Sequence, residues 1–342
     1  MLGLDISDQT VKLVRLTTQG ALSLTAHCWQ AVPGGLIERG VIQRPAELAR
    51  IIDAALSLCR VSEREAEPVV AVLPDIQSFL RVVEMPVMQA DEMTEAVRWE
   101  VGRHIPFGLE NVYIDWQPIG EGHHPAAGRQ EVLVGAAQRR AVDPLIAVLR
   151  ELKLNVAALE LESQAIVRAL ISPELRRHRG LLVVDLGGTA TNVVIHDHGA
   201  MRFTASLQRG MRDLTSVLSS DDAALVSLPQ QPKLNGDVGQ RVAGQLQAGQ
   251  EALVMEIRGI AEFYNSIDEQ HEVREILLTG GGSNLPGLDT VFLRFFGNVH
   301  VQRGNPWVNI LRAGKEKQPP LSLQESVHFT TALGAALRPV VA

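Results

Sequence analysis

Two segments of this sequence repeat the same order of features: an apolar strand, an aspartate, a tight turn and a second strand. The first is LGLDISDQTVKLVRL, with Asp5 before its turn, and the second is LLVVDLGGTATNVVIHDHG, with Asp185 in the equivalent place. Backbone N–H groups in such a turn can bind anionic oxygens, while the carboxylate reaches hydrated Mg²⁺. One aspartate before a turn is ordinary hairpin chemistry. Its repetition favours a phosphate-binding function for both copies.

The residues of both turns are the candidate phosphate ligands. The set comprises turn residues and a lysine on the strand after the first turn: Ser7, Gln9, Thr10, Lys12, Gly187, Gly188 and Thr189. Asp5 and Asp185 are the candidate Mg²⁺ residues, acting mainly through water because Mg²⁺ keeps much of its hydration shell. Asp8 is unusual here, since its charge would repel a polyanion unless the side chain faces away or Lys12 offsets it.

A third feature is the glycine cluster in ILLTGGGSNLPGL, late in the chain. Glycine allows a close backbone approach, so the loop of Gly280, Gly281 and Gly282 with Ser283 suits an adenosine lying across it. The sequence lacks the GxxxxGK[ST] pattern of a P-loop. Two facing phosphate hairpins and a late glycine loop describe the actin-like ATPase fold. That fold is an α/β, duplicated ribonuclease H-like architecture with two lobes around a nucleotide cleft.

Two side chains before the second hairpin are candidates for orienting an attacking water. Glu162 and Gln164 lie in LELESQAIVRAL, at the start of an expected helix. Phosphoryl transfer to water needs little beyond positioning and charge stabilisation, so one such side chain would suffice. Both also fit the polar first turn of an ordinary helix, and this alternative stays open.

Composition limits the classes of protein to consider. A chain of 342 residues can hold two lobes, and 46% hydrophobic with 21% charged residues is typical of a folded globular protein. The net charge of −7 argues against nucleic acid as a partner. Cys28 and Cys59 lack CxxC spacing, which predicts reduced thiols in a cytoplasmic protein. We expect neither a signal peptide nor direct membrane insertion, because no apolar run approaches about 20 residues.

The remaining pattern predicts an inserted unit and a polar region. The stretch VVAVLPDIQSFLRVVEM predicts paired strands broken at Pro74. The pattern of residues 84–157 predicts a compact unit of a helix, two strands and a second helix. This unit is inserted before the second phosphate hairpin. Residues 216–250 are rich in Gln, Ser and Asp, which indicates a small, mobile subdomain.

The motifs resemble the PilM family, the actin-like, FtsA-related proteins of type IV pilus assembly. The resemblance rests on LGLDIS, VVDLGGTATNVVI, LLTGGGSNLPGL and, above all, the insert, in which a helix ending in IPF precedes a Val/Tyr-rich strand. It implies FtsA-type subdomains over nearly the whole chain. They are 1A at 1–83, completed by about 158–178 and 325–342; 1C at 84–157; 2A at 179–215 and 266–324; and 2B at 216–265.

The resemblance also implies ligands and partners. ATP or ADP with Mg²⁺ would bind between the lobes, and the cytoplasmic N-terminal peptide of PilN, an inner-membrane pilus protein, would bind between subdomains 1A and 1C. The suspected groove residues are Trp99, Ile105, Pro106 and Phe107, which could equally form the core of the insert. PilN would hold the protein at the cytoplasmic side of the inner membrane and connect it with other pilus platform and motor proteins.

Whether the chain is an enzyme is left open by the sequence. In the Glu-Pro-x-Ala pattern of several members of the fold, Glu162 and Ala165 match, but Ser163 replaces proline. The departures at Ser163, Ser7 and Asp8 count against hydrolysis of a bound nucleotide more than against its binding. We therefore expect at most a slow ATPase. A small-molecule kinase of the same fold and an FtsA-like filament protein are the alternatives. The first lacks an evident base for an acceptor hydroxyl, and the second a C-terminal amphipathic helix.

Overall fold

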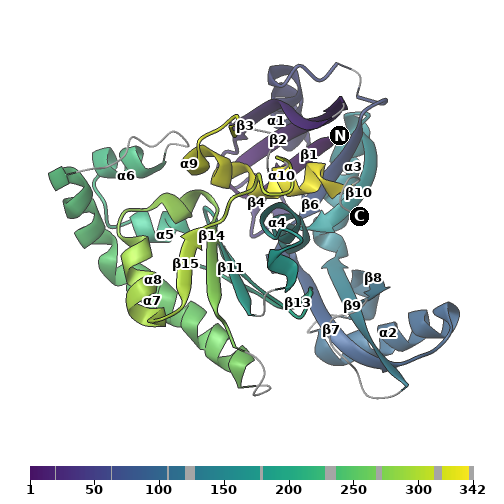
Figure 1. Cartoon of the computed structure of the whole chain (residues 1–342). Helices are drawn as coiled ribbons and strands as arrows, with labels where there is room; N and C mark the ends of the chain where they lie inside the picture. Colours follow the sequence, from purple (N-terminus) through teal and green to yellow (C-terminus); the bar gives the residue numbers. More distant parts are fainter. Residues whose placement is uncertain are drawn as a thin grey trace.

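Two five-stranded sheets with the same strand order form the framework of the molecule (Figure 1). The computed structural model describes residues 1–19, 21–62, 64–105, 108–119, 128–177, 180–227, 236–266, 272–311 and 318–338. The first sheet has the order β10-β6-β1-β2-β3, made of β1 (Leu2–Ile6), β2 (Thr10–Gln19), β3 (Ala21–Ala31), β6 (Pro68–Leu73) and β10 (Asn155–Leu161). The second has the order β13-β12-β11-β14-β15, made of β11 (Leu181–Leu186), β12 (Thr191–Asp197), β13 (Ala200–Leu207), β14 (Glu275–Thr279) and β15 (His300–Arg303).

Each sheet starts as an antiparallel meander and is extended by parallel strands. Strand β1 pairs antiparallel with β2 and parallel with β6, and β11 pairs in the same way with β12 and β14. Asp5 and Asp185 therefore occupy equivalent places near the ends of equivalent strands. The duplication predicted from the two hairpin segments is confirmed.

Helices cover both faces of the first sheet, which explains why its inner strands β1 and β6 are continuous apolar runs. Helices α1 (Pro45–Leu58) and α3 (Arg139–Glu151) share a core with β1, β2 and β6. Helices α4 (Glu162–Leu170) and α10 (Thr330–Ala336) pack on the other face, where Ala165 and Ala335 contact Val70 and Val72 of β6. We call this sheet with its four helices the first lobe.

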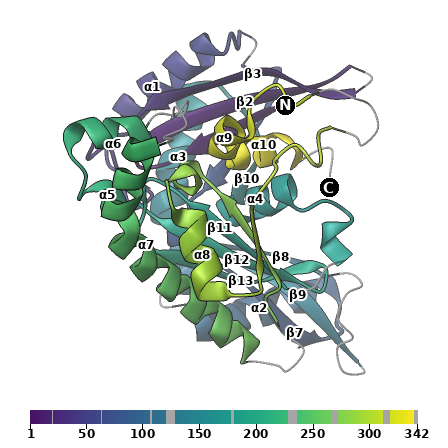
Figure 2. The same ribbon diagram turned by 60° about the vertical axis from the view of Figure 1, so that its left-hand side comes forward.

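The second lobe is the second sheet with the helices that follow it in sequence. They are α5 (Met211–Thr215), α6 (Ser220–Ser227), α7 (Gly236–Asn265) and α8 (Leu288–Phe296), of which α7 and α8 lie together against the sheet (Figure 2). The predicted polar subdomain at 216–265 consists of a turn at 216–219 and the helices α6 and α7. Residues 228–235 lie outside the described part. Although α7 has 30 residues, neither it nor another described helix is apolar enough over a sufficient length to cross a membrane.

Short elements connect these parts. They are the two-stranded sheet of β4 (Ile37–Glu38) and β5 (Val41–Ile42), the helix α9 (Leu323–Ser326), and the 3₁₀ turns η1 (Asp75–Gln77), η2 (Leu109–Asn111), η3 (Leu175–Arg177), η4 (Gly281–Asn284) and η5 (Val327–Phe329).

A third, three-stranded sheet has the order β7-β9-β8 and is formed by β7 (Ser78–Pro86), β8 (Val112–Pro118) and β9 (Arg129–Gln138). Helix α2 (Ala90–His104) packs on it through Met93, Val97 and Val101. We call these elements the small sheet unit. Its first strand begins at Ser78 rather than at 84, and α3 and β10 belong to the first lobe, so the predicted limits 84 and 157 differ from the observed ones. The predicted pairing within VVAVLPDIQSFLRVVEM is wrong, because η1 sends β6 and β7 into different sheets.

The two cysteines are also placed differently from the prediction. Cys28 on β3 and Cys59 at the end of α1 form a disulfide, with their Cα atoms 5.9 Å apart. The expectation of reduced thiols is therefore wrong, because the sequence separation of 31 residues hid a contact that the packing of α1 on β3 creates.

Two close backbone contacts fix α10 in the first lobe. A Cβ atom at Gly3 would lie 1.9 Å from the carbonyl oxygen of Ala332, and one at Gly334 would lie 1.8 Å from that of Ala165. Only glycine at these positions lets α10 approach β1 and α4 so closely.

We expect Gly334→Ala to lower the free energy of unfolding by about 2 kcal/mol or more, because neither backbone can yield locally. Gly259→Ala in α7 is the matched control. A Cβ there would have no atom within 4 Å, so it should stabilise the protein by about 0.5–1 kcal/mol through helix propensity. Urea denaturation of both variants measures the difference, and equal effects of the same sign would contradict this account of α10.

A buried histidine makes the stability depend on pH. His196 on β12 is buried, and its Nδ1 has no hydrogen-bond partner among the described residues. Burial, together with the nearby charge of Arg176, lowers the pKa of His196 to about 4. Because the unfolded histidine titrates near about 6.5, the unfolded chain takes up the proton first. The stability present above about pH 6.5 is therefore lost as the pH falls toward 4.

We expect wild type to lose about 2.5 kcal/mol more than His196→Gln between about pH 7 and pH 4.5. Buried His328, whose pKa is also lowered to about 4, acts in the same direction in both proteins, so the comparison cancels it. Denaturant titrations at the two pH values measure the difference, with the exposed His300→Gln as control. Parallel losses in wild type and His196→Gln would show that His196 is not responsible.

Candidate functional site

A cavity of about 430 Å³ lies between the two lobes. Both predicted turns, the glycine loop and the end of the chain that leads into α10 line it. Of the residues predicted from sequence, it is lined by Asp5, Ser7, Gln9, Thr10, Lys12, Glu162, Asp185, Gly187, Gly188, Thr189, Gly280, Gly281 and Gly282. Segments that are far apart in the sequence therefore meet in one cleft.

The two turns are equivalent in their hydrogen bonds. The Ser7 N–H donates to the carbonyl of Thr10 at 2.9 Å, and the Gly187 N–H donates to that of Ala190 at 3.0 Å. In the first turn the Ser7 hydroxyl also accepts from the Thr10 N–H at 3.2 Å, so serine closes a turn that the second copy makes with glycine. Because the Ser7 and Gly187 amides are used inside the turns, the N–H groups of the next two residues in each turn are the candidate phosphate donors.

The turns also contact each other across the cleft. The Thr189 hydroxyl donates to the Asp8 carboxylate at 3.4 Å, and a Cβ atom at Gly188 would lie 2.1 Å from Gln9 Oε1. Asp8 in turn accepts from the N–H groups of Arg39 and Gly40, both at 2.9 Å. The Asp8 carboxylate is thus held by the β4–β5 turn while it lines the cleft.

The floor of the cleft has an excess of negative charge. Asp5 accepts from Lys12 Nζ at 3.1 Å, and Asp75, Glu162 and Asp185 lie near this pair. Burial, together with Asp5, raises the pKa of Asp185 to about 6, and burial with the charge of Asp185 raises that of Asp75 to about 7. Burial disfavours the charged form of Lys12, but Asp5 outweighs this and its pKa is raised. Such a set of buried carboxylates favours a nearby positive charge.

The neighbours of the glycine loop leave no room for side chains at its glycines. Gly280 has a φ of 79°, and a Cβ there would lie 2.4 Å from Asp185 Oδ1. A Cβ at Gly281 would meet the His328 ring at 2.8 Å. Ser283 is the exception among the predicted nucleotide-binding residues, because it is fully buried behind the loop and donates to the Gly280 carbonyl at 2.7 Å.

His328 lines the cleft and was missed by the sequence analysis. It precedes α10, and its Nε2 lies 3.4 Å from Asn284 Nδ2. Burial lowers its pKa to about 4, helped by the charge of Lys12, so the imidazole is neutral. The only sequence signal was the Ser322–Glu325 pair, which forms a capping box just before it and marks a helix start near the cleft.

The two candidate water-orienting residues are separated by the fold. Glu162 faces the cleft, accepting from Asn192 Nδ2 at 2.9 Å and from the Asp75 N–H at 3.3 Å. Burial and the charges of Asp75, Asp5 and Asp185 raise its pKa well above the usual value. Gln164 instead accepts from the Leu161 N–H at 3.3 Å and lines a different cavity. We therefore give Gln164 no role in the cleft.

That second cavity, of about 350 Å³, lies between the first lobe and the small sheet unit. One wall is β8, from which the consecutive residues 113–117 line it, and the other includes residues 159–161 of β10. Leu80, Leu133 and Ile146 supply apolar surface. Both β8 and β10 are edge strands of their sheets, so two open sheet edges face one groove.

Of the groove residues predicted from sequence, Trp99 and Ile105 do not line this cavity. Trp99 on α2 is 78% exposed, and Ile105 is buried in the core of the small sheet unit. Pro106 and Phe107 lie outside the described residues. The aromatic side chains that do line the groove are Tyr113 and Trp116 of β8. Tyr113 donates to Asp143 of α3 at 2.9 Å and lies under the Arg139 guanidinium, 4.1 Å from its ring centre.

Comparison with known proteins agrees with this architecture. A family model described as type IV pilus assembly protein PilM matches residues 3–340. A solved PilM–PilN type IV pilus biogenesis complex is 29% identical, with 99% of this chain and 98% of that chain covered and a TM-score of 0.80. The ethanolamine utilization protein EutJ from Carboxydothermus hydrogenoformans is 16% identical over 98% of this chain and 88% of that chain, with a TM-score of 0.59. At that identity the likeness concerns the fold alone.

The family match covers nearly the entire sequence, including both acidic hairpins, the small sheet unit and the glycine loop. The duplicated sheets around a cleft are those of the actin-like ATPase fold predicted from the two hairpins. This chain belongs to the PilM family of type IV pilus assembly proteins.

Proposed function

We propose that this protein is a nucleotide-binding scaffold of type IV pilus assembly. It binds ATP or ADP with Mg²⁺ between the lobes and a PilN peptide between the first lobe and the small sheet unit. The observation that carries the proposal is the meeting of two equivalent acidic turns, one from each lobe, beside a glycine loop in a single cleft.

The donor set of the cleft fits a magnesium nucleotide. Asp5 and Asp185 would hold Mg²⁺, which would neutralise the phosphates when bound. Contact through water is favoured, because Mg²⁺ dehydrates reluctantly and keeps much of its hydration shell. The N–H groups of the two turns would bind the phosphates, while the glycine loop and His328 would lie against the nucleoside.

Any hydrolysis would be slow. Glu162 is held by Asn192 and by the Asp75 N–H, so it is positioned at the cleft. Burial and the neighbouring carboxylates raise its pKa above the usual value, and Ser163 stands where several members of the fold have proline beside this glutamate. We propose that bound nucleotide acts mainly by fixing the relative position of the lobes.

The groove suits an extended peptide that adds to the edge of a sheet. Ile119 N–H donates to the carbonyl of Glu131 at 2.8 Å, and the pairing of β8 with β9 is regular. Along an edge strand, successive residues point their N–H and C=O groups alternately toward the neighbouring strand and away from it. Since Ile119 points its N–H toward β9, Ile114 and Trp116 point their N–H and C=O groups away from β9. Asp115 already occupies the Trp116 N–H at 2.9 Å, which leaves Ile114 as the main donor for a peptide strand.

The solved PilM–PilN complex supports PilN as the source of this peptide. We propose that its short cytoplasmic N-terminal segment binds here and so holds this protein at the cytoplasmic face of the inner membrane. Other pilus platform and motor proteins would be connected through that assembly.

A thermal-unfolding experiment tests the nucleotide site. Mg²⁺–ATP or Mg²⁺–ADP at about 100 times its Kd should stabilise wild type by roughly 2.7 kcal/mol, a rise of a few degrees in Tm. Asp185→Asn should abolish this rise without lowering the Tm of the free protein, because it removes one charge from a crowded acidic set. Asp289→Asn, at an exposed aspartate of α8, is the control. Unchanged Tm of wild type with every nucleotide would refute the site.

A peptide titration tests the groove. Ile114→Pro removes the outward N–H of β8 without touching the β8–β9 bonds, so it should weaken binding of an N-terminal PilN peptide by about tenfold or more. Ile114→Val retains the N–H and the apolar contact and should bind nearly as wild type. Fluorescence anisotropy measures both affinities. Equal affinities of the two variants would exclude strand addition at Ile114.

A further inference from the structure

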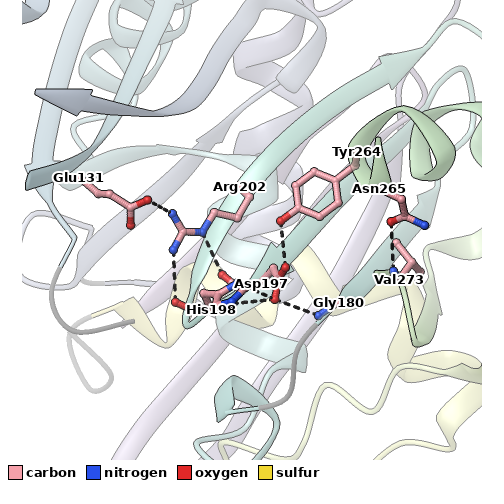
Figure 3. A network of polar contacts seen from close by, with 8 residues as sticks. All are labelled: Glu131, Gly180, Asp197, His198, Arg202, Tyr264, Asn265 and Val273. Atoms are coloured by element: carbon pink, nitrogen blue, oxygen red, sulfur yellow. Dashed lines mark hydrogen bonds and ion pairs between the residues drawn. The ribbon is translucent and has the colours of Figure 1, made fainter. Parts of the chain in front are cut away.

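The small sheet unit is fastened to the second lobe by a buried ion pair. Arg202 on β13 donates to Glu131 on β9 at 2.5 Å, and both side chains are only 9% exposed (Figure 3). Beside this pair, the Thr204 hydroxyl donates to the carbonyl of Leu80 on β7 at 3.4 Å. Figure 1 shows β13 next to β7, where the edges of their sheets meet.

The second-lobe side of this contact is rigidly built. The Arg202 Nε also donates to the carbonyl of Asp197 at 3.0 Å. The fully buried Asp197 carboxylate accepts from the N–H groups of Gly180 at 3.1 Å and His198 at 2.8 Å and from the Tyr264 hydroxyl at 3.0 Å (Figure 3). These bonds join the start of β11, the β12–β13 turn and the end of α7. Arg202 is therefore fixed to the body of the second lobe.

The same strand reaches the nucleotide cleft. Four residues beyond Arg202, the Ser206 hydroxyl contacts Asn192 Oδ1 at 2.5 Å, and Asn192 Nδ2 donates to Glu162 at 2.9 Å. Gln208, just after β13, lines the cleft. A displacement of the second lobe on nucleotide binding would therefore move Arg202 with it.

On the other side, Glu131 lies next to the peptide groove. Its carbonyl accepts from Ile119, directly after β8. The groove has β8 as one wall and β10 of the first lobe as the other. At the Tyr113–Asp143 bond the small sheet unit also contacts the first lobe. The groove wall is thus attached to both lobes, so their relative position sets its width.

On the basis of the proposed function, we propose that the Arg202–Glu131 pair transmits the relative position of the lobes to the peptide groove. Nucleotide in the cleft and peptide in the groove then change each other's affinity. The effect is reciprocal, because a coupling free energy between two bound ligands acts equally on both. The nucleotide must favour one lobe position and the peptide must distinguish it from the other.

The test is the Kd of a labelled PilN peptide with and without a saturating non-hydrolysable Mg²⁺–ATP analogue. We expect the two values to differ by about fivefold or more in wild type. Glu131→Gln removes the ion pair, and Thr204→Val, as a milder second variant, removes the neighbouring bond to Leu80. Both should bring the ratio of Kd values toward about one while retaining each ligand's binding in the absence of the other. Glu272→Gln is the control, because it removes an exposed ion pair with Arg274 in the same lobe.

The outcomes separate this proposal from the proposed function. If wild type fails to bind nucleotide or peptide, the proposed function is wrong and the coupling fails with it. If both bind and the ratio in wild type is about one, only the coupling is refuted. A ratio that stays at its wild-type value in both Glu131→Gln and Thr204→Val would show that the pair does not transmit it.

Discussion

The arrangement of the molecule depends on the buried excess of acid at the floor of its cleft. Asp5 and Asp185 come from opposite lobes, and Glu162 and Asp75 add to them, with Lys12 as the cation that contacts Asp5. Desolvated carboxylates that face each other are costly. The pKa values of Asp75, Glu162 and Asp185 are raised accordingly, and Lys12 pairs with Asp5. Since the acids belong to different lobes, whatever neutralises them also governs how the lobes meet. This makes a charged ligand an effective means of setting their relative position.

The parts of the fold that could be predicted from the sequence are those that follow from local residue patterns. The Asp5 and Asp185 hairpins each combine an apolar strand, a turn and a second strand, and the structure gives them the same pairing and the same turn bond. Strands covered on both faces produce continuous apolar runs, which made them recognisable. The glycine loop could also be recognised in the sequence, because its glycines are required: a Cβ atom at any of the three would collide with a neighbouring residue.

The parts that could not be predicted depend on contacts between distant segments. Nothing in the alternation of VVAVLPDIQSFLRVVEM indicates that β6 joins one sheet and β7 another, because both are ordinary strands locally. Gln164 and Glu162 are two positions apart on one helix, and that separation turns their side chains to different cavities. His328 enters the cleft only through the docking of η5 and α10, so the capping box before it indicated a helix start but not a site.

The edges of the three sheets explain where the molecule is closed and where it is open. An edge strand presents unpaired N–H and C=O groups and is a template for another strand. At one pair of edges, β13 and β7 cover each other, and the buried Arg202–Glu131 pair secures the contact. At another pair, β10 and β8 do not meet but face a cavity with apolar walls. The small sheet unit therefore contacts the second lobe along one edge, while its other edge faces the cavity. Because β9 is bonded to both edge strands, a force applied at the covered edge reaches the open one through a single strand.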